Sequence, residues 1–259
     1  MGGERFLVSR RRQTAVIRVL TVNAHQGLRA LRRSAMLAGM RDALRETGAD
    51  LVFLQEIGVA AGSAGPGSQY EVLADTVWPE HAYGRNAVSA GGHHGNALLS
   101  RHPIDSWRNV DASVGRAEPR GLLYCVLRIP GFPRALHAVC VHLALTESHR
   151  RRQVGRLIEL VNEAVPAADP LVIAGDFNDW RERSHRRLTA ELGLQEVHAG
   201  PGRRPRRSFP ARLPCLRLDR IYVRNLGYRG IDVSRQPWAR LTDHVPLAAD
   251  LSMPTANRS

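Results

Sequence analysis

Short apolar segments that end or begin at a polar residue recur along this chain, and they constrain its fold more than any other feature. The clearest is the apolar run 171–174, which leads into Gly-Asp-Phe-Asn-Asp over residues 175–179. A run of this length predicts a buried strand, and side chains two residues apart on extended backbone point to the same face. Asp176 and Asn178 are therefore expected to lie together where a strand ends.

The hydrophobic pattern of the remaining chain predicts further strands, two helices and two loops. Helices are expected over residues 29–47 and in a segment that Thr146 caps and Pro166 ends. Residues 58–69 and 198–212 are predicted loops. The other predicted strands cover residues 16–23, 51–56, 95–100, 121–129, 135–143, 218–223 and 243–247. Because strands and helices alternate first and strands follow one another later, we expect an α/β (α+β) fold with mixed sheets and helices on the outer faces.

No linker, repeat or composition shift divides the 259 residues, so one domain is expected over residues 15–253. Residues 1–14 are predicted to form a flexible basic arm and residues 254–259 a tail. Cys125 and Cys140 lie inside apolar runs, and no Cys-x-x-Cys pair exists, which indicates free thiols in a reducing compartment. No segment has the apolar length of a signal peptide or a membrane span, so we expect a cytoplasmic protein.

The charge of the chain favours anionic partners. All 37 basic residues are arginine, and the formal net charge is +13. A genome bias toward arginine codons is the simplest explanation of the missing lysine, but such a surface attracts polyanions whatever its origin. Arginine also binds phosphate with two parallel hydrogen bonds. Nucleic acid, nucleotides and anionic lipid headgroups are therefore the expected classes of partner.

The polar residues at the strand termini are predicted to converge. These residues are Asn23, Glu56, His142 and Asp176 at strand ends, and Asp219 and Asp243-His244 at strand starts. If the last two strands run antiparallel to the first four, all six points meet at one edge of the sheets. A solvated boundary residue explains any one of them but not the whole set.

Such a group of side chains suits metal-dependent hydrolysis of phosphate esters. Several carboxylates with amides and no thiolate favour Mg²⁺ or Mn²⁺ over zinc. Hydrolysis of a phosphodiester needs an activated water, stabilisation of charge on the phosphate and help for the leaving oxygen. A metal on Glu56, an aspartate that polarises water and a cationic histidine would supply these. An aspartate beside that histidine would raise its pKa and keep it charged.

The motifs around these residues resemble those of the endonuclease/exonuclease/phosphatase superfamily. They occur in the family's order and span roughly residues 16–251, almost the whole chain. The motifs are Asn23, Leu54-Gln55-Glu56, Gly95 to Ser100, Val141-His142-Leu143, Gly175 to Asn178, Leu218 to Ile221 and Thr242 to Leu247. The resemblance implies a four-layer sandwich, with two mixed sheets packed face to face, helices on both outer faces and the site at one end.

The resemblance also implies a metal site. Glu56 would be the main metal ligand, with Asn23 beside it. Asp243 is expected to touch a metal as well. The implied cofactor is Mg²⁺ or Mn²⁺, and the sequence leaves the number of ions open.

The same resemblance assigns catalytic roles. Asp176 would orient or deprotonate the attacking water, and Asn178 would hold a phosphate oxygen. His244 would contact the scissile phosphate, with Asp219 orienting it. His142 resembles the second histidine of the deoxyribonuclease I and sphingomyelinase branches.

Two departures weaken a role in abasic-site repair. Residues 23–29 read Asn-Ala-His-Gln-Gly-Leu-Arg, with an extra residue and a histidine where repair enzymes carry an acid or amide, and Leu216 replaces an aromatic residue. The chain is closer to an uncharacterised bacterial branch with Arg-Gly-Leu-Leu-Tyr at 120–124 and Gly-Asp-Phe-Asn-Asp-Trp at 175–180. We expect a nuclease acting on DNA or RNA. The alternatives are a phosphatase or phosphodiesterase for a phospholipid headgroup, nucleotide or other small ester, and a catalytically silent nucleic-acid-binding domain.

Arg120, His94 and Asn96 are predicted to contact the substrate. Arg120 is suited to bidentate phosphate binding, although an ion pair with Glu118 or Glu147 is an equal alternative. His94 follows a glycine pair, so a mobile loop carrying it to substrate competes with a solvated loop.

Aromatic and arginine-rich positions outside the motifs have simpler interpretations. Trp107 and Trp180 are expected to be packed rather than free to stack on a base. The arginine cluster 150–152 begins a helix whose other face is apolar, so it is expected to point to water. The clusters at 181–187 and 203–207 flank the predicted site and are candidates for binding an extended anion.

Overall fold

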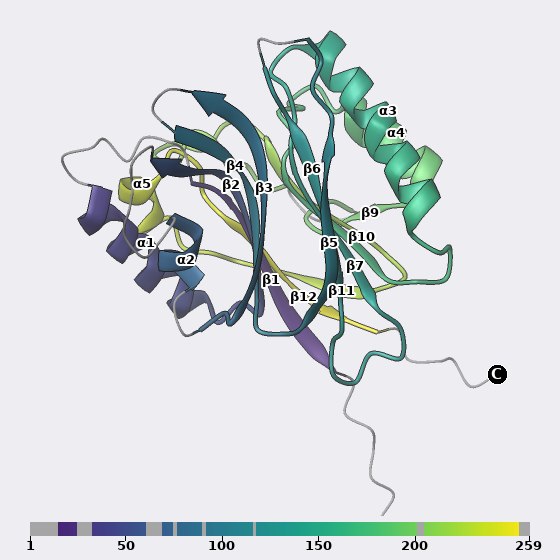
Figure 1. Cartoon of the computed structure of the whole chain (residues 1–259), viewed down its shortest axis with the longest axis horizontal. Helices are drawn as coiled ribbons and strands as arrows, with labels where there is room; N and C mark the ends of the chain where they lie inside the picture. The colour runs from purple at the N-terminus through teal and green to yellow at the C-terminus, as the bar shows by residue number, and fades with distance from the viewer. Residues whose placement is uncertain are drawn as a thin grey trace, which may run out of the picture.

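Two mixed β-sheets packed face to face form the centre of the molecule, with helices on both outer faces (Figure 1). The structure is a computed structural model. It describes residues 15–24, 33–60, 69–74, 77–89, 92–115, 118–200 and 205–253. The arrangement confirms the predicted α/β four-layer sandwich. The predicted arm at 1–14 and the predicted tail at 254–259 lie outside the described residues.

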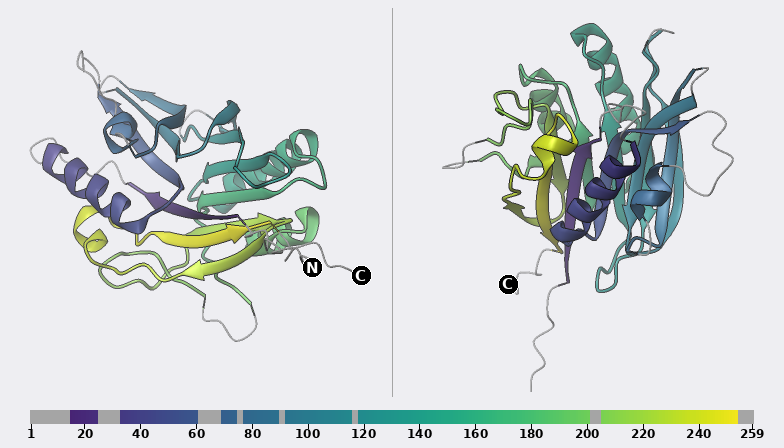
Figure 2. Two further views of the ribbon diagram at one scale, coloured as in Figure 1. Left: turned by 90° about the horizontal axis from the view of Figure 1, so that it is seen from below. Right: turned by 90° about the vertical axis from the view of Figure 1, so that its left-hand side faces the viewer.

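The first sheet has the strand order β11-β12-β1-β2-β4-β3. In that order the strands cover Gly227–Ile231, Leu247–Ser252, Val16–Asn23, Leu51–Ala60, Gly92–Ser100 and Glu80–Ser89. β1 and β2 are parallel, whereas β12 and β4 run antiparallel to them. The helices α1 (Arg33–Thr47), α2 (Gln69–Ala74) and α5 (Trp238–Leu241) lie on its outer side (Figure 2).

The second sheet has the strand order β5-β6-β7-β8-β10-β9. These strands cover Ile104–Asp111, Gly121–Leu127, Leu136–His142, Leu171–Asp176, Asp219–Arg224 and Gln195–Glu196. β7 and β8 are parallel, and β10 runs antiparallel to β8. The helices α3 (Glu147–Ala164) and α4 (Arg183–Leu192) cover its outer face. None of the helices in the described part of the chain is long and apolar enough to cross a membrane.

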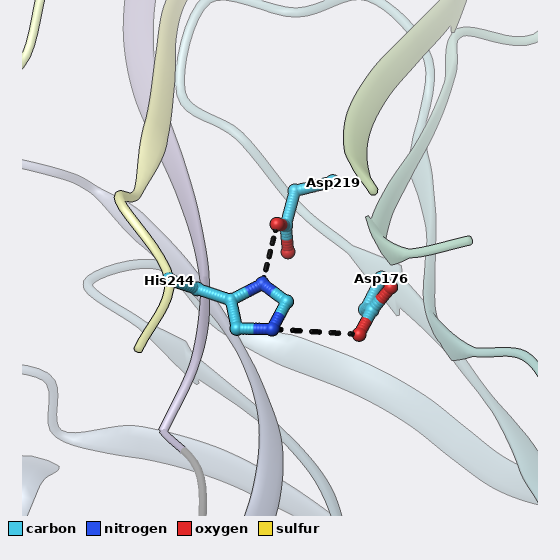
Figure 3. A group of neighbouring side chains, drawn as sticks. All are labelled: Asp176, Asp219 and His244. Atoms are coloured by element: carbon cyan, nitrogen blue, oxygen red, sulfur yellow. Dashed lines mark hydrogen bonds and ion pairs between the residues drawn. The ribbon is translucent and has the colours of Figure 1, made fainter. Parts of the chain in front are cut away.

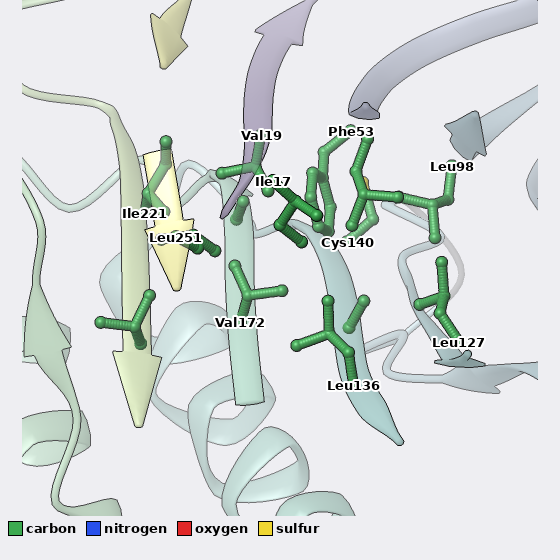
Figure 4. Packing of buried hydrophobic residues seen from close by; sticks show 14 of the residues in the cluster. Ile17, Val19, Phe53, Leu98, Leu127, Leu136, Cys140, Val172, Ile221 and Leu251 are labelled. Atoms are coloured by element: carbon green, nitrogen blue, oxygen red, sulfur yellow. The ribbon is translucent and has the colours of Figure 1, made fainter. Parts of the chain in front are cut away.

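The inner strands are buried on both faces, which explains why they read as continuous apolar runs. In β2, Phe53 packs between the sheets while Val52 and Leu54 pack under the helices. Figure 4 shows the inter-sheet layer, to which both sheets contribute side chains. Cys125 and Cys140 belong to this layer as buried free thiols, as predicted.

Elements with few buried apolar residues escaped the sequence prediction. The edge strand β5 exposes most of its side chains, and β3 at the edge of the other sheet is also largely polar. The helix α4 buries only Ser184, Leu188 and Leu192 among arginines and other polar residues. Edge elements of this kind need little apolar sequence, because one side faces water.

Two predicted boundaries are wrong. The loop expected over 58–69 is partly strand, because β2 continues to Ala60; residues 61–68 lie outside the described residues, and α2 begins at Gln69. The last strand begins at Leu247 rather than at Asp243. Pro246 has no N–H for a ladder, and the Val245 N–H donates to the Ser208 carbonyl at 2.8 Å. The segment before β12 is therefore a loop.

Gly175 in β8 allows the close approach of β7 and is expected to tolerate no side chain. Its φ is +148°, and a Cβ there would lie 1.9 Å from the Val141 carbonyl oxygen. We expect Gly175→Ala to destabilise the protein by about 3 kcal/mol or more. Gly193→Ala is the matched control, because Gly193 has φ +64° with nothing near its Cβ position; it should cost about 1–2 kcal/mol. Urea unfolding compares the two, and equal losses would contradict the steric account.

Candidate active site

The polar strand termini meet at one edge of the sandwich, as predicted. β12 runs antiparallel to β1 and β10 runs antiparallel to β8, so the starts of the late strands lie beside the ends of the early ones. In the ladder registers, His142 and Asp219 both lie opposite Asp176. Asn23 at the end of β1 lies opposite Gln55, beside Glu56.

Asp176 is the centre of the cluster. The Asn23 side-chain amide donates to Oδ2 of Asp176 at 3.1 Å and to Oε1 of Glu56 at 3.2 Å, and so joins the two sheets. His142 Nε2 lies 3.6 Å from Oδ2 of Asp176 and 3.8 Å from Oε1 of Glu56. All of these groups except Glu56 are buried.

A histidine–aspartate pair also faces Asp176 (Figure 3). His244 Nδ1 lies 2.7 Å from Oδ2 of Asp219, and His244 Nε2 lies 4.0 Å from Oδ2 of Asp176. Burial alone would lower the pKa of His244, but the Asp219 carboxylate and its hydrogen bond raise it to about 10. The imidazole is therefore a cation at neutral pH, and its Nε2–H points toward Asp176.

Burial sets the protonation of Asp176 and His142. It raises the pKa of Asp176 to about 7, and the neighbouring Asp219 carboxylate adds to the shift. It lowers the pKa of His142 to about 3, and the Arg120 cation acts in the same direction. The site therefore brings together the neutral imidazole of His142, the charged imidazole of His244 and the Asp176 carboxyl group, which gains a proton readily. Perturbed groups of this kind mark functional sites.

A β-bulge aims Glu56 at the cluster. The pairing of β2 with β4 shifts register between Leu54 and Ile57, and Glu56 has φ +57°. Without the bulge Glu56 would share the helix-facing side of Leu54, but Ile57 takes that side instead. Bulges beside active sites redirect a side chain in this way, and a left-handed residue that is not glycine carries strain.

Asn178 reaches the cluster through a turn. The extended backbone ends at Asp176, and Asn178 has φ +50°. Its backbone N–H donates to Oδ1 of Asp176 at 2.9 Å, and its side-chain amide donates to the Leu143 carbonyl at 2.9 Å. The two residues lie together, as predicted, but the turn brings them together rather than the alternation of a continuing strand.

The donor set suits an oxygen-preferring divalent cation. Glu56, Asp176, Asp219 and Asp243 can each be negative, and Oδ1 of Asp219 is buried without a hydrogen bond from the described residues. The Glu56 side chain is 19% exposed and that of Asp243 is 37% exposed, so the cluster opens to solvent on their side. Carboxylate and amide oxygens are what Mg²⁺ and Mn²⁺ prefer.

The close group Asp176, Asp219 and His244 offers three ligand atoms within 4.8 Å of one another. We do not assign this group as a metal site, because a protonated imidazole whose Nδ1 is bound to Asp219 has no lone pair to give. Glu56, with its side chain 19% exposed, lies nearer to solvent than these three buried residues. Asp243 lies 4.0 Å from His244 Nε2 at the same rim.

The predicted substrate contacts lie around the cluster in different settings. Arg120 pairs with Glu118 at 2.9 Å, the alternative that the sequence left open, and its charge still reaches His142. Burial lowers the pKa of His94, and the nearby Glu56 carboxylate opposes that shift. Asn96 is fully buried and donates to the Gly121 carbonyl at 2.9 Å, so its side chain links the sheets beneath the site.

Buried arginines, which sequence reasoning missed, hold the loops of the site. Arg150 was expected to face water but is buried, and it donates to the carbonyls of Ala144 and Leu145 at 2.9 Å each. Arg220, also buried, donates to the Asp179 carbonyl at 2.8 Å and pairs with Glu196. Arg220 lies inside the motif Leu218 to Ile221, which was the available signal for it, whereas Arg150 lies outside the motifs.

Trp180 and Trp107 are not packed, contrary to expectation. Trp180 follows the Asp176–Asn178 turn with 53% of its surface exposed, and the Arg181 guanidinium lies 4.3 Å from its ring centroid. Trp107 on the edge strand β5 is 50% exposed. An indole beside a cation at the rim of the site is available for stacking.

Comparisons with known proteins agree with this architecture. Residues 20–244 match the model of the Endonuclease/Exonuclease/phosphatase family. Uncharacterized protein YbhP of Escherichia coli K12 is 45% identical over 245 residues, which cover 91% of this chain and 96% of YbhP.

Solved structures show the same fold at low sequence identity. An endonuclease/exonuclease/phosphatase from Beutenbergia cavernae superposes with a TM-score of 0.72 at 21% identity, covering 95% of this chain and 74% of that one. The human Nocturnin catalytic domain with bound sulfate gives a TM-score of 0.72 at 17% identity, covering 93% and 97% of the two chains. The family match and the bacterial relative cover nearly all of the sequence, and the chain belongs to the endonuclease/exonuclease/phosphatase family.

Proposed function

We propose that this protein is a divalent-metal-dependent phosphodiesterase of the nuclease type. The observation that carries the proposal is the position of Asp176, which contacts Asn23 and Asn178 and faces His142 and His244. Around the Asp176 carboxylate lie a neutral imidazole, a charged imidazole and two asparagines. Together they can supply the base, the cationic phosphate contact and the hydrogen-bond donors that diester hydrolysis needs. We extend the proposal to residues 15–253 as one catalytic domain.

The metal would be held on the solvent side of the cluster. Glu56 and Asn23 are the proposed ligands, and Asp243 is a further contact at the same rim. The excess of carboxylates over cations supports a site for positive charge there. When bound, Mg²⁺ or Mn²⁺ would supply charge stabilisation for the phosphate and its leaving oxygen.

Asp176 is the proposed base. Its Oδ2 faces both His142 and His244, and its Oδ1 is held by the Asn178 N–H, so the carboxylate is fixed in orientation. A water beside Oδ2 would be oriented for attack on phosphorus and would give its proton to this oxygen. Neutral His142 can accept a hydrogen bond from the same water or from substrate.

His244 and Asn178 are the proposed phosphate contacts. The charged His244 presents Nε2–H to the anion, and Asp219 holds the ring by its Nδ1. Asn178 is tied to Asp176 by its backbone N–H, and its side-chain amide would bind a non-bridging oxygen. We propose Arg120 and His94 as the outer part of the substrate site, with buried Asn96 supporting it through the strands that its side chain links.

The substrate is proposed to be nucleic acid. The net charge of +13 and the exposed Trp180–Arg181 pair suit a polyanion that carries bases. A small phosphate ester remains the second candidate because the catalytic cluster needs only one phosphate. A silent binding domain has no use for the buried ionisable groups, which are costly to keep.

A substrate panel tests the proposal. Wild type and Asp176→Asn would be assayed with Mg²⁺ and Mn²⁺ on bis(p-nitrophenyl) phosphate, p-nitrophenyl phosphate, single-stranded and duplex DNA, and RNA. Nucleic-acid cleavage by wild type that Asp176→Asn lacks is the expected result. Turnover of small esters alone would select the second candidate, and binding of DNA without any turnover would select the silent domain.

A further inference from the structure

Two adjoining hollows lie beside the proposed active site, where β11 and β9 form the edges of the two sheets. The larger, of about 1030 Å³, lies between the loop 205–217 and the segment 230–235. The smaller, of about 330 Å³, lies between Ala211, Arg212 and the start of α5. Arg235 lines both hollows, so together they form one surface that we call the arginine groove.

The arginine groove begins at the rim of the catalytic cluster. Val245, which lines the larger hollow, follows His244 directly. Ala211, which lines the smaller one, donates its N–H to the Asp243 carbonyl at 2.7 Å. On the other side of the same loop, the Phe209 ring lies 5.0 Å from the His244 ring. A ligand leaving the catalytic cluster past Asp243 and His244 therefore enters the groove.

The charge of the groove is positive and largely uncompensated. Arg206 pairs with Asp232, and Arg217 pairs with Glu182 and Glu196, so those charges are balanced. The remaining arginines are exposed, and none forms an ion pair with a carboxylate among the described residues. These are Arg207, Arg212, Arg235 and Arg240.

The shape and the chemistry fit a single nucleic-acid strand. Four guanidinium groups spread over two hollows match an anion that repeats along its length, whereas a small ester would occupy the catalytic cluster alone. Proteins bind single strands with basic grooves that follow the backbone. A bilayer surface fits less well, because membrane-surface binding needs an apolar face and the described part of this loop exposes Leu213 alone among large apolar side chains.

We infer that the arginine groove is a second phosphate-binding site, which holds the backbone of a single nucleic-acid strand whose scissile phosphate lies at Asp176 and His244. The inference rests on the proposed function for the position of that phosphate. Arg207 and Arg235 are the residues that define it, one on each wall. They bind substrate and do no chemistry.

The test compares two double variants of the full-length protein. Arg207→Gln/Arg235→Gln removes two charges from the groove. Arg101→Gln/Arg128→Gln removes two exposed charges at the other end of the sandwich, near the start of β2 and the end of β6. Surface ion pairs such as those of Arg101 and Arg128 contribute little to stability, so both variants are expected to fold.

Binding is measured without turnover, by fluorescence anisotropy of a labelled single-stranded 20-mer in EDTA. The groove variant should bind about tenfold more weakly than wild type. The magnitude of the slope of log K against log salt should fall by about 1.4, since two phosphate contacts are lost and each one releases about 0.7 counterion from a single strand. The control variant should keep the wild-type slope. Equal weakening in both variants would overturn the inference, because it would reflect net charge alone.

Two further arms separate the outcomes. The rate of bis(p-nitrophenyl) phosphate hydrolysis should be unchanged in the groove variant, because that diester reaches only the catalytic cluster. Loss of binding to phosphatidylglycerol vesicles with oligonucleotide binding intact would overturn the inference in favour of a lipid surface. The anisotropy measurement needs no catalysis, so it tests the groove even if wild type hydrolyses no ester. Absence of hydrolysis would contradict the proposed function and not the groove.

Discussion

Asp176→Asn is expected to lower kcat for a phosphodiester by about 10³-fold, in the range that removal of a general base costs. The amide keeps the size of the side chain and the hydrogen bond from the Asn178 N–H, but it cannot take a proton from water. Steady-state kinetics with bis(p-nitrophenyl) phosphate measure the effect. Asp250→Asn is the matched control, because Asp250 pairs with Arg18 and Arg229 at the other end of β12. A similar loss of kcat in both variants would argue against a special role for Asp176.

The same variant is expected to be at least as stable as wild type without metal. The pKa of Asp176 is about 7 in the folded protein against 3.8 for a free carboxyl. The folded state therefore binds the extra proton between these values, and the free energy of unfolding falls as pH rises from about 4 to about 7. The neutral amide escapes this loss. Thermal unfolding in EDTA at pH 8 should give an equal or higher Tm for Asp176→Asn, and a clearly lower Tm would contradict the burial argument.

Asp219→Asn is expected to lower kcat by about 10²-fold at pH 8. Asp219 is the main group that keeps His244 charged, so its loss lets burial lower the pKa of the imidazole. The ratio of wild-type to variant activity should shrink between pH 8 and pH 6, because His244 regains its proton. His244→Gln, which has no imidazole to protonate, should show no such recovery. A ratio for Asp219→Asn that is constant with pH would refute the charge argument.

The pH dependence of the unfolding free energy is an independent test of the His244–Asp219 pair. The pKa of His244 is raised from 6.5 to about 10 in the folded protein. The stabilisation from the pair is therefore fully present below pH 6.5 and is lost as pH rises through about 10. The difference in unfolding free energy between wild type and Asp219→Asn should follow that course.

The sequence predicted the convergence of the site but not its local geometry. The apolar runs that end at Asn23, His142 and Asp176 are strands buried on both faces. Because β1 is parallel to β2 and β7 is parallel to β8, the ends of each pair lie at the same edge. The aim of Glu56 depends on a bulge with φ +57°, which no periodicity in residues 51–60 reveals. Bulges are tertiary features, because they require a partner strand to shift against.

The burial of arginine side chains was the feature that the sequence predicted least well. The run 150–152 has one composition but two environments: Arg150 is buried on backbone carbonyls while Arg151 and Arg152 are exposed. The guanidinium can satisfy its donors on carbonyl oxygens inside the protein, so charge alone did not place it at the surface. The same limit applies to the arginine groove, whose two walls, residues 205–217 and 230–235, come together only in the fold.

The central claim is that the cluster around Asp176 hydrolyses phosphate esters with a metal held by Glu56. The most direct measurement is the Mg²⁺ dependence of bis(p-nitrophenyl) phosphate hydrolysis by EDTA-treated wild type and Glu56→Gln. Wild type should be inactive in EDTA and regain activity with Mg²⁺, while Glu56→Gln should need at least about tenfold more Mg²⁺ and reach a lower rate. Turnover in EDTA equal to that with Mg²⁺, or a wild-type Mg²⁺ dependence in Glu56→Gln, would contradict the account.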